Sequence, residues 1–375
     1  MGVQTPANTA AYLQSKKAPK LTVRSAPYTP AKASQIVIKN HAIAINPLDW
    51  LVQERGDIMF GWLKYPFIMG IDVAGEVVEV GSAVTRFKIG DRVIGFCTGT
   101  NENINDAAQS GFQEYTVVLD HMSAKIPDSM SYEKASVIPL GLSTASCGLF
   151  QTDQLSLQLP TSPARKQTGK TILIWGGSTS VGVNAIQLAV AAGYEVFTTC
   201  SPRNYELVKS LGASQAWDYN SPTVVNDMVK AFKDGKKKNV GAMSIGQGAA
   251  SFCLDILGRI EGDKFLAMAS YPTPATLPKR FAFLYQIWTF LSGIVKLYVK
   301  AVMKGVKLGF IFGGTLVDNG IGKEIYGNYV EKALEMGDFK AAPEPEVFGR
   351  GLDKLQGAME AQRKGVSAKK IIVVL

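Results

Sequence analysis

A strand, a glycine loop and a helix follow one another near the middle of this sequence, and no other feature constrains the fold as strongly. Residues 171–175 form an apolar run typical of a buried strand, residues 176–182 read GGSTSVG, and residues 181–193 have the periodicity of an amphipathic helix. Gly176 suits the turn, and Gly182 lets the helix approach the strand closely. This order predicts a βαβ unit within a parallel sheet. Further strands of that sheet are expected at residues 195–200, 216–219, 241–246, 251–258 and 264–270.

The chain is expected to form two domains, because its 375 residues exceed what a single hydrophobic core usually holds. From about residue 34 to 120, short β-branched runs alternate with Gly and Asp turns, which predicts an antiparallel, barrel-like domain. After Pro139, strands and helices alternate, which predicts a doubly wound parallel sheet and hence an α/β fold. The tail from about residue 310 returns to the first domain. We assign residues 1–136 and 308–375 to the barrel-like substrate domain and residues 137–307 to the cofactor domain.

The composition is that of an ordinary folded protein, with 46% apolar and 19% charged residues. Cysteines at 97, 147, 200 and 253 form no CxxC pair, which indicates buried thiols in a reducing compartment. The amino terminus lacks the features of a secretory signal, so we expect a cytoplasmic protein. The net charge of +9 is spread without an aromatic-interleaved basic cluster, so no nucleic-acid partner is expected. An anionic cofactor and an anionic substrate explain the excess better.

The glycine loop is a candidate dinucleotide site. Such a loop directs free amide N–H groups and the positive end of a helix dipole towards a pyrophosphate, and the hydroxyls of Ser178, Thr179 and Ser180 can add hydrogen bonds. The motif departs from the usual one, because Thr179 and Ser180 stand where such loops usually carry glycine. Its place between a strand and a helix, with a second strand about twenty residues later, favours a cofactor site over a plain connecting turn.

The end of the second strand indicates which dinucleotide binds. NAD enzymes place an acidic residue there for the ribose 2′-hydroxyl, whereas residues 198–204 read TTCSPRN and contain none. Their hydroxyls and the Arg203 guanidinium suit a 2′-phosphate. The alternative is that Arg203 only begins a helix in water. We predict NADPH in preference to NADH.

Neither metal nor hydrolase chemistry is indicated. The two histidines of the sequence, His41 and His121, lack a second ligand at metal spacing, and both are expected to be structural or surface residues. The sequence has no GxSxG nucleophile motif, and neither histidine has a recognisable acidic partner for a catalytic triad.

Residues 281–295 form a run of fifteen residues without a charge. A bilayer span needs about 20 apolar residues, and lysines from residue 296 onward interrupt the run, so a transmembrane helix is not expected. We expect residues 281–301 to wall the substrate cleft, and a dimer surface, internal packing or a membrane contact are the alternatives. The side chains available to a bulky hydrophobic substrate are Phe283, Ile287, Trp288 and Phe290.

Five short motifs follow one another along the chain: NPLD at 46–49, GIDVAG at 70–75, GDRV at 90–93, LGLSTA at 140–145 and the glycine loop. Over nearly the whole chain they resemble the quinone-oxidoreductase-like medium-chain dehydrogenases/reductases. In detail the chain is similar to fungal zinc-binding-dehydrogenase-like proteins, which include concanamycin-induced protein B, and more distantly to the trans-acting enoyl reductases of polyketide synthases. The resemblance implies a GroES-like barrel domain joined to a Rossmann domain.

The resemblance also implies an enzyme without zinc. Zinc-dependent members of this superfamily carry a cysteine ligand near position 46, a GHE motif at 70–72 and four closely spaced structural cysteines. Here those places hold Asn46, the residues GID, and a loop in which Cys97 is the single cysteine. We therefore expect metal-free chemistry.

By position, the resemblance implies the residues of the cofactor site and of part of the substrate pocket. It leaves the catalytic proton donor unidentified, because the tyrosine that enoyl-thioester reductases use near Asp49 is absent. The contacts implied near the nicotinamide are Leu48, Asp49 and Thr144, with Leu257, Gly258, Val366 and Ser367 around its ribose. Those implied at the pyrophosphate are Ser178, Thr179, Ser180 and Val181, beside Gly176. Those implied at the 2′-phosphate and adenosine are Ser201, Arg203, Asn204 and Tyr219, and the substrate pocket takes Phe310, Ile311, Phe312, Gly313 and Gly314.

Conjugate reduction is the chemistry that we expect, because no zinc would polarise a carbonyl. NADPH would deliver hydride to the β-carbon of an enone, quinone or enoyl thioester, and hydrogen bonds would stabilise the enolate oxygen before a proton reaches the α-carbon. The expected partner is a small hydrophobic substrate, including a carrier-bound acyl chain, in secondary metabolism or detoxification. The alternatives are a zinc-free carbonyl reductase or alcohol dehydrogenase, and a catalytically weak NADPH-binding protein. A monomer and a homodimer both remain open.

Overall fold

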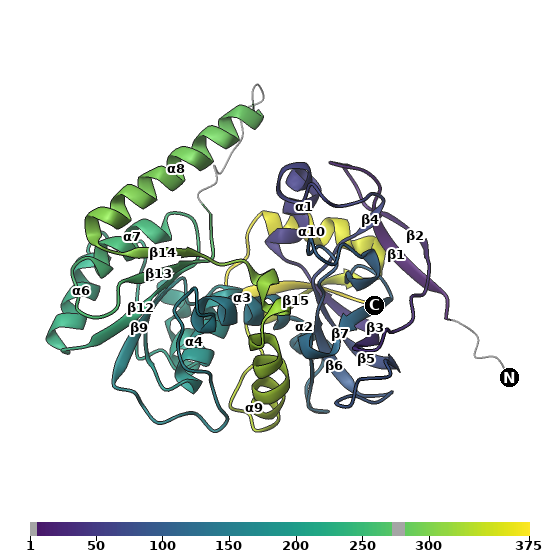
Figure 1. Cartoon of the computed structure of the whole chain (residues 1–375), viewed down its shortest axis with the longest axis horizontal. Coiled ribbons are helices and arrows are strands. Elements are labelled where there is room, and N and C mark those ends of the chain that lie inside the picture. The colour runs from purple at the N-terminus through teal and green to yellow at the C-terminus, as the bar shows by residue number, and fades with distance from the viewer. Residues whose placement is uncertain (1–5, 272–281) are drawn as a thin grey trace. The chain divides into compact units, whose positions relative to one another are not determined.

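The computed structural model describes residues 6–271 and 282–375, apart from the side chains of residues 57–59, 282, 283 and 286. Its contacts divide the chain into two compact units (Figure 1). Unit 1 comprises Met1–Ser143 with Leu316–Leu375, and unit 2 comprises Thr144–Thr315. The boundaries predicted from the sequence, after residues 136 and 307, lie slightly earlier in the chain.

Unit 1 contains a seven-stranded mixed sheet rich in β-branched and aliphatic residues. In order across the sheet, its strands are β15 (Glu344–Arg350), β16 (Lys369–Val374), β3 (Gln35–Ala44), β5 (Asp72–Val80), β6 (Arg92–Phe96) and β8 (Ser123–Lys125), and β7 (Tyr115–Leu119) also pairs with β3. β15 and β16 are parallel, and the other pairs are antiparallel. Gly75 lets β3 and β5 approach closely, because a Cβ at that position would lie 2.0 Å from the Lys39 carbonyl oxygen.

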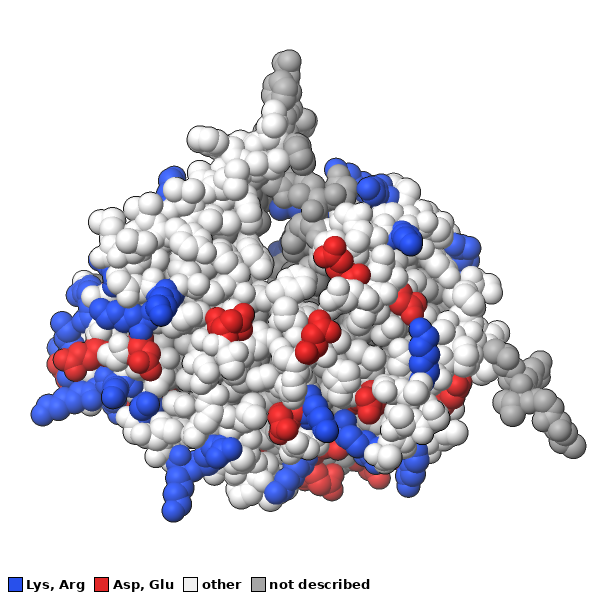
Figure 2. Space-filling model, in the orientation of Figure 1, with Lys and Arg blue, Asp and Glu red and all other residues white. Residues whose placement is uncertain are grey.

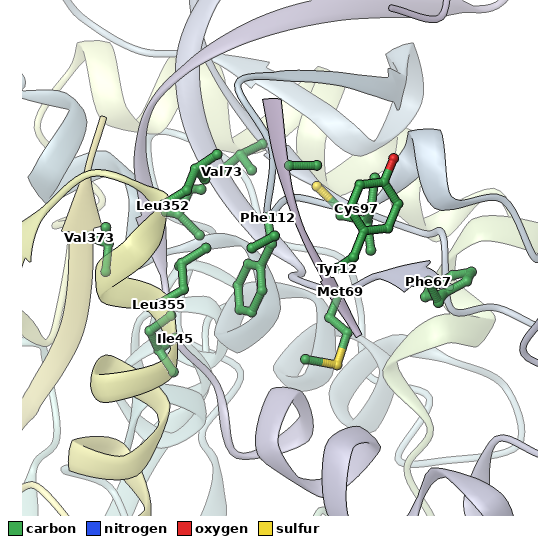
Figure 3. Packing of buried hydrophobic residues seen from close by; sticks show 14 of the residues in the cluster. Tyr12, Ile45, Phe67, Met69, Val73, Cys97, Phe112, Leu352, Leu355 and Val373 are labelled. Atoms are coloured by element: carbon green, nitrogen blue, oxygen red, sulfur yellow. The ribbon is translucent and has the colours of Figure 1, made fainter. Parts of the chain in front are cut away.

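The core of unit 1 lies against this sheet and a second, three-stranded one. The second sheet consists of β2 (Thr22–Ala26), β1 (Asn8–Leu13) and β4 (Phe67–Ile68). The core contains Tyr12, Met69 and Phe112, together with Leu355 of α10 (Leu355–Arg363) (Figure 3). Burying each such side chain stabilises the fold by about 1.5 to 3 kcal/mol. The other helical segments are α1 (Pro47–Met59), η1 (Ala107–Gln109), η2 (Asp120–Met122), α2 (Tyr132–Ser136), η5 (Lys323–Val330), α9 (Glu331–Glu335) and η6 (Leu352–Lys354).

Unit 2 contains the doubly wound parallel sheet that the sequence predicts. In order, its strands are β11 (Gln215–Trp217), β10 (Glu195–Thr199), β9 (Lys170–Trp175), β12 (Lys238–Ser244), β13 (Phe265–Met268) and β14 (Lys307–Phe310), and all these pairs are parallel. The chain order reverses between β9 and β12, and doubly wound sheets bind ligands beyond the carboxyl ends of the strands at such a reversal. The helices are α4 (Ser180–Ala191), η3 (Pro202–Asn204), α5 (Tyr205–Ser210), α6 (Val224–Asp234), α7 (Ala249–Leu257) and α8 (Ala282–Lys304). The segments α3 (Pro139–Phe150) and η4 (Gly313–Asp318) contain the divisions between the units.

One strand prediction in unit 2 is wrong. Residues 251–258 belong to α7 and the residue that ends it, not to a strand. The buried residues of α7 include Ala250, Cys253, Leu254 and Leu257, a spacing of three and four that places them on one face of a helix. Among the described helices, none is long and apolar enough to cross a lipid bilayer.

Candidate cofactor and active site

The glycine loop that follows β9 is fixed by its own hydrogen bonds. Gly176 has a φ of +89°, in the left-handed region that favours glycine, and its N–H donates to Thr199 Oγ1 at 3.1 Å. Thr179 caps α4, because its Oγ1 accepts the Gly182 N–H at 3.0 Å and donates to the Gly176 carbonyl oxygen at 2.8 Å. A Cβ on Gly182 would lie 2.2 Å from that carbonyl oxygen. The loop therefore presents the amino-terminal end of α4, where anions bind readily.

Side chains predicted for the adenosine end lie beyond the carboxyl ends of β9, β10 and β11. Asn204 Nδ2 donates to Ser178 Oγ at 3.3 Å, which connects the loop after β10 to the glycine loop. Ser201 Oγ and Tyr219 Oη are 3.0 Å apart. Arg203 is exposed and forms no ion pair with the residues that the structure describes. Its guanidinium is therefore available to an anion at this edge of the sheet.

Thr144 and the predicted substrate segment 310–314 are neighbours within unit 2. A Cβ on Gly313 would lie 3.2 Å from Thr144 Oγ1. Phe310 stacks on Tyr271, with ring centroids 5.1 Å apart. The structure thus brings together a residue predicted for the nicotinamide and a segment predicted for the substrate.

Other residues predicted for the site lie in both units. In unit 2, Leu257 is buried at the end of α7, and Trp288 on α8 is 71% exposed. In unit 1, Leu48 lies in the first turn of α1, and residues 366–367 are exposed in the loop before β16. The side chain of Phe283 lies outside the described residues. Their roles in binding remain predictions.

A buried polar cluster in unit 1 joins four distant parts of the chain. Lys370 Nζ donates to Asn46 Oδ1 at 2.6 Å and to Asp72 Oδ2 at 2.9 Å. The Asn46 side-chain amide donates to the same Asp72 oxygen at 3.0 Å, and Asp72 Oδ1 accepts the Leu140 N–H at 2.7 Å. Asp49 Oδ2 accepts the Asn46 N–H at 2.8 Å at the start of α1. Lys370, the most exposed of these four polar side chains, is only 4% exposed.

Burial shifts the pKa of two groups at this cluster, Asp49 and Cys97. Burial raises the pKa of Asp49 to about 7. The hydrogen bond from the Asn46 N–H and the charge of Lys370 lower this pKa, whereas the charge of Asp72 raises it further. Burial also raises the pKa of the Cys97 thiol, and both nearby carboxylates add to that effect. Asp49 therefore gains or loses its proton near neutral pH, whereas Cys97 stays a thiol and is not an activated nucleophile.

The sequence analysis did not identify Lys370. The sequence does contain a signal that Lys370 is buried, because the residues after it, 371–374, are all apolar, as in a strand that is buried on both faces. A lysine inside such a strand needs a buried partner. The identity of that partner was not readable, because Asp72 lies 298 residues away in the sequence.

Comparisons with known proteins place the chain in a family. Residues 32–128 match the family model of the alcohol dehydrogenase GroES-like domain. Over 370 residues, which are 99% of this chain and 100% of the relative, the chain is 56% identical to dehydrogenase pigH of Monascus ruber. The chain belongs to the medium-chain dehydrogenase/reductase family. Within it, the chain is 40% identical to the zinc-binding alcohol dehydrogenase domain-containing protein cipB of Emericella nidulans, over 98% of both proteins. It is 39% identical to trans-enoyl reductase himH of Aspergillus japonicus, over 90% of this chain and 89% of that one.

Solved structures of medium-chain dehydrogenases/reductases share the fold. The CurK enoyl reductase matches with a TM-score of 0.72 at 18% identity, over 98% of this chain and 99% of that one. A mycobacterial protein complexed with NADPH matches with a TM-score of 0.67 at 19% identity, over 98% and 100%. The predicted family and α/β fold are confirmed. The protein is an oxidoreductase whose fold binds a nicotinamide cofactor.

The positions at which zinc-dependent medium-chain dehydrogenases/reductases carry metal ligands do not fit a zinc ion here. Two of them hold Asn46 and Asp72, and the Lys370 ammonium already lies within hydrogen-bond distance of both side chains. In the part of the chain that the structure describes, no group of three or more His, Cys, Asp and Glu side chains is arranged to hold a metal. His41 instead stacks on Tyr132, with ring centroids 4.6 Å apart.

Proposed function

We propose that this protein is a metal-free, NADPH-dependent reductase of activated C=C bonds in enones, quinones or enoyl thioesters. The observation that carries the proposal is the position of Lys370, whose ammonium is fixed between Asn46 and Asp72. A cation that belongs to the protein lies between two side chains at positions of the family's metal ligands, so the proposed reduction of the C=C bond uses no metal as a Lewis acid. Conjugate addition of hydride suits such a site, because the negative charge of the enolate that forms is delocalised onto an oxygen, which hydrogen bonds can stabilise. The enoyl reductases among its relatives favour the same chemistry.

NADPH is proposed because the end of β10 offers a guanidinium and hydroxyls instead of an acidic residue. Arg203 is exposed, and Ser201, two residues before it, lies in hydrogen-bond contact with Tyr219 from the loop after β11. A 2′-phosphate would accept charge-assisted hydrogen bonds from this group, whereas residues 198–204 supply no carboxylate for a ribose 2′-hydroxyl.

The residues of the chain mainly bind and orient the reactants. Bound NADPH supplies the hydride. The glycine loop would hold the pyrophosphate at the amino-terminal end of α4, and Thr144, beside Gly313, would orient the nicotinamide end. In the substrate the hydride joins the β-carbon, the π electrons of the C=C bond move to the enolate oxygen, and a proton from water joins the α-carbon. No side chain of the protein is assigned to the proton transfer.

The proposed substrate is small and hydrophobic, or an acyl chain on a carrier, in secondary metabolism or detoxification. The aromatic character of the segment 310–314, in which Phe310 stacks on Tyr271, suits an apolar acceptor. Trp288 is proposed as a further wall of the same pocket.

A substrate panel tests this function. Purified protein is incubated with NADPH or NADH and with enones, quinones, enoyl thioesters and aldehydes, and with NADP⁺ and alcohols. We expect NADPH oxidation with a saturated product from the C=C acceptors, identified by mass spectrometry. Turnover of aldehydes or alcohols alone would support the carbonyl reductase or alcohol dehydrogenase alternative, which the name of the dehydrogenase relative pigH favours. Tight NADPH binding without turnover of any substrate would support the weakly catalytic alternative.

A further inference from the structure

Helix α8 is the longest helix of unit 2, and only part of its surface is packed. Towards its carboxyl end, Ala301 is buried in the core, and Leu297 packs against the same core. Lys300 Nζ forms an ion pair with Asp255 of α7 at 2.6 Å and donates to Ser251 Oγ at 2.7 Å. The amino-terminal half runs outward beyond α7 (Figure 1). This attachment fixes which face of α8 is turned away from unit 2.

The outward face of α8 is apolar. Of the nineteen large hydrophobic side chains that are exposed in the described chain, ten lie on this one helix. At about 100° per residue around the helix axis, the ten side chains lie within an arc of roughly 160°, with Ile287 at one edge and Met303 at the other. Val302 and Met303 are 77% and 79% exposed, and the projecting part of α8 is largely uncharged in the space-filling view (Figure 2). The ten residues are Leu284, Tyr285, Ile287, Trp288, Leu291, Val295, Tyr298, Val299, Val302 and Met303.

A patch of this kind on a soluble protein marks a surface that binds something, and its charge and width favour one occupant. The ionisable side chains of α8 include lysines and tyrosines but no acidic residue. Lys296 is exposed beside the apolar arc, and it forms no ion pair with a described residue. A second copy of α8 would bring lysines against lysines, and a helix pair covers only a narrow seam, so Ile287 and Met303 would stay exposed. An anionic lipid surface is complementary to both the lysine and the wide apolar arc.

We infer that the outward face of α8 binds the surface of an anionic phospholipid bilayer, with the helix lying in the plane of the headgroups. The aromatic side chains support this arrangement, because Trp288, Tyr285 and Tyr298 combine an apolar ring with a polar atom and such residues favour the membrane–water interface. The helix binds the bilayer without crossing it. The inference does not depend on the reductase function proposed above, and Trp288 is the one residue that the two proposals share.

Vesicle flotation of the full-length protein tests the inference. Vesicles of phosphatidylcholine with phosphatidylserine should carry the protein, and vesicles of phosphatidylcholine alone should carry much less. Changing Leu291→Ser together with Val302→Ser should lower the partition coefficient by about tenfold or more. Both side chains are exposed, so folding should survive, and circular dichroism checks that it does. The matched control is Ile89→Ser in unit 1, an exposed apolar residue of similar exposure, which should leave binding unchanged.

Two further measurements locate the contact. Lys296→Glu should weaken binding to the anionic vesicles by several-fold and shift its salt dependence, because an attraction becomes a repulsion. Brominated lipids should quench tryptophan fluorescence in the wild-type protein, and most of the quenching should disappear in Trp288→Phe, which still binds.

Two outcomes would overturn the inference. One is equal partition of wild type and the Leu291/Val302 variant. The other is a dimer, measured by sedimentation equilibrium without lipid, that dissociates in the same variant while vesicles bind neither protein. That second outcome would assign the face to a second copy of this chain.

Discussion

Lys370 Nζ lies 2.9 Å from Asp72 Oδ2, and both side chains are almost completely removed from solvent. Desolvating two charges is costly, and their mutual attraction together with the Asn46 and Leu140 hydrogen bonds offsets that cost. Removing only one partner leaves the other buried without its counter-charge. The pair is therefore more sensitive to a single substitution than to a double one.

Lys370→Met should lower the free energy of unfolding by about 3 to 5 kcal/mol, because Asp72 would remain buried and unpaired. Chemical denaturation at neutral pH measures the change. Adding Asp72→Asn to the variant should restore part of the loss. The neighbouring Lys369 provides the control, since its pair with Glu346 is exposed and Lys369→Met should cost about 0 to 1 kcal/mol. Equal effects at positions 369 and 370 would contradict the buried pair.

Asp49 should make the protein less stable as the pH rises. Its pKa is about 7 in the folded protein and about 3.9 in an unfolded chain. Between these values the folded state binds more protons than the unfolded state, so this contribution is complete below about pH 4 and is lost as the pH passes about 7. Asp49→Asn should remove the trend, which is at most about 1.4 kcal/mol per pH unit. Unfolding curves at several pH values check it, with the exposed Asp128→Asn as control; an unchanged slope in Asp49→Asn would refute the shifted pKa.

Arg203→Ala should weaken NADPH binding by about 1 to 3 kcal/mol, the usual cost of a lost charged hydrogen bond, and leave NADH binding nearly unchanged. Isothermal titration with each cofactor measures both affinities. Lys233→Ala on α6 removes an exposed charge away from β10 and should change neither affinity. Equal losses for the two cofactors in Arg203→Ala would remove the NADPH assignment.

Treatment with a strong chelator should leave activity and Tm unchanged, because the cluster around Lys370 needs no metal to be satisfied. Elemental analysis of the purified protein accompanies the assay. Stoichiometric zinc that leaves together with activity would show the metal-free proposal to be wrong.

Trp288→Ala should raise KM for long-chain or aromatic enones more than for methyl vinyl ketone if Trp288 walls the substrate pocket. The kinetics are measured without vesicles, so that a lipid contact of α8 does not enter. Tyr298→Ala, on the same exposed face of α8, is the control and should leave both KM values unchanged. An equal rise of KM for both substrates, or none, would remove Trp288 from the pocket.

Local patterns predicted much of the fold. The strand, loop and helix around Gly176 can be predicted because an apolar strand, turn glycines and apolar residues at helical spacing follow one another within about twenty residues. The sheet of unit 2 follows from the repetition of that strand–helix unit. The strand prediction for residues 251–258 is wrong because a short apolar run shows neither the strand period nor the helix period clearly. The packing of these residues against the sheet of unit 2 determines that they form a helix.

The buried polar cluster of unit 1 could not be predicted from local sequence patterns, for a different reason. Asn46 and Asp72 were recognised as departures from zinc ligands, but the group that replaces the metal comes from Lys370, which is 324 residues from Asn46 in the sequence. A pairing over that distance is specified by the register of β16 against β3 and by no nearby residue. The exposed face of α8 is a similar case, because the sequence shows an apolar helix but not which side the rest of unit 2 covers.

Lys370 belongs to the final strand of the chain, and this has a consequence for biosynthesis. During translation unit 2 is complete once residue 315 has emerged, whereas unit 1 still lacks β16 and with it the cation for Asp72. Because domains generally fold as units while the chain is being made, unit 2 can fold first, and unit 1 must wait for residues 369–374 of β16. A nascent chain stalled before residue 369 has emerged from the ribosome should therefore contain a protease-resistant unit 2 attached to an unfinished unit 1.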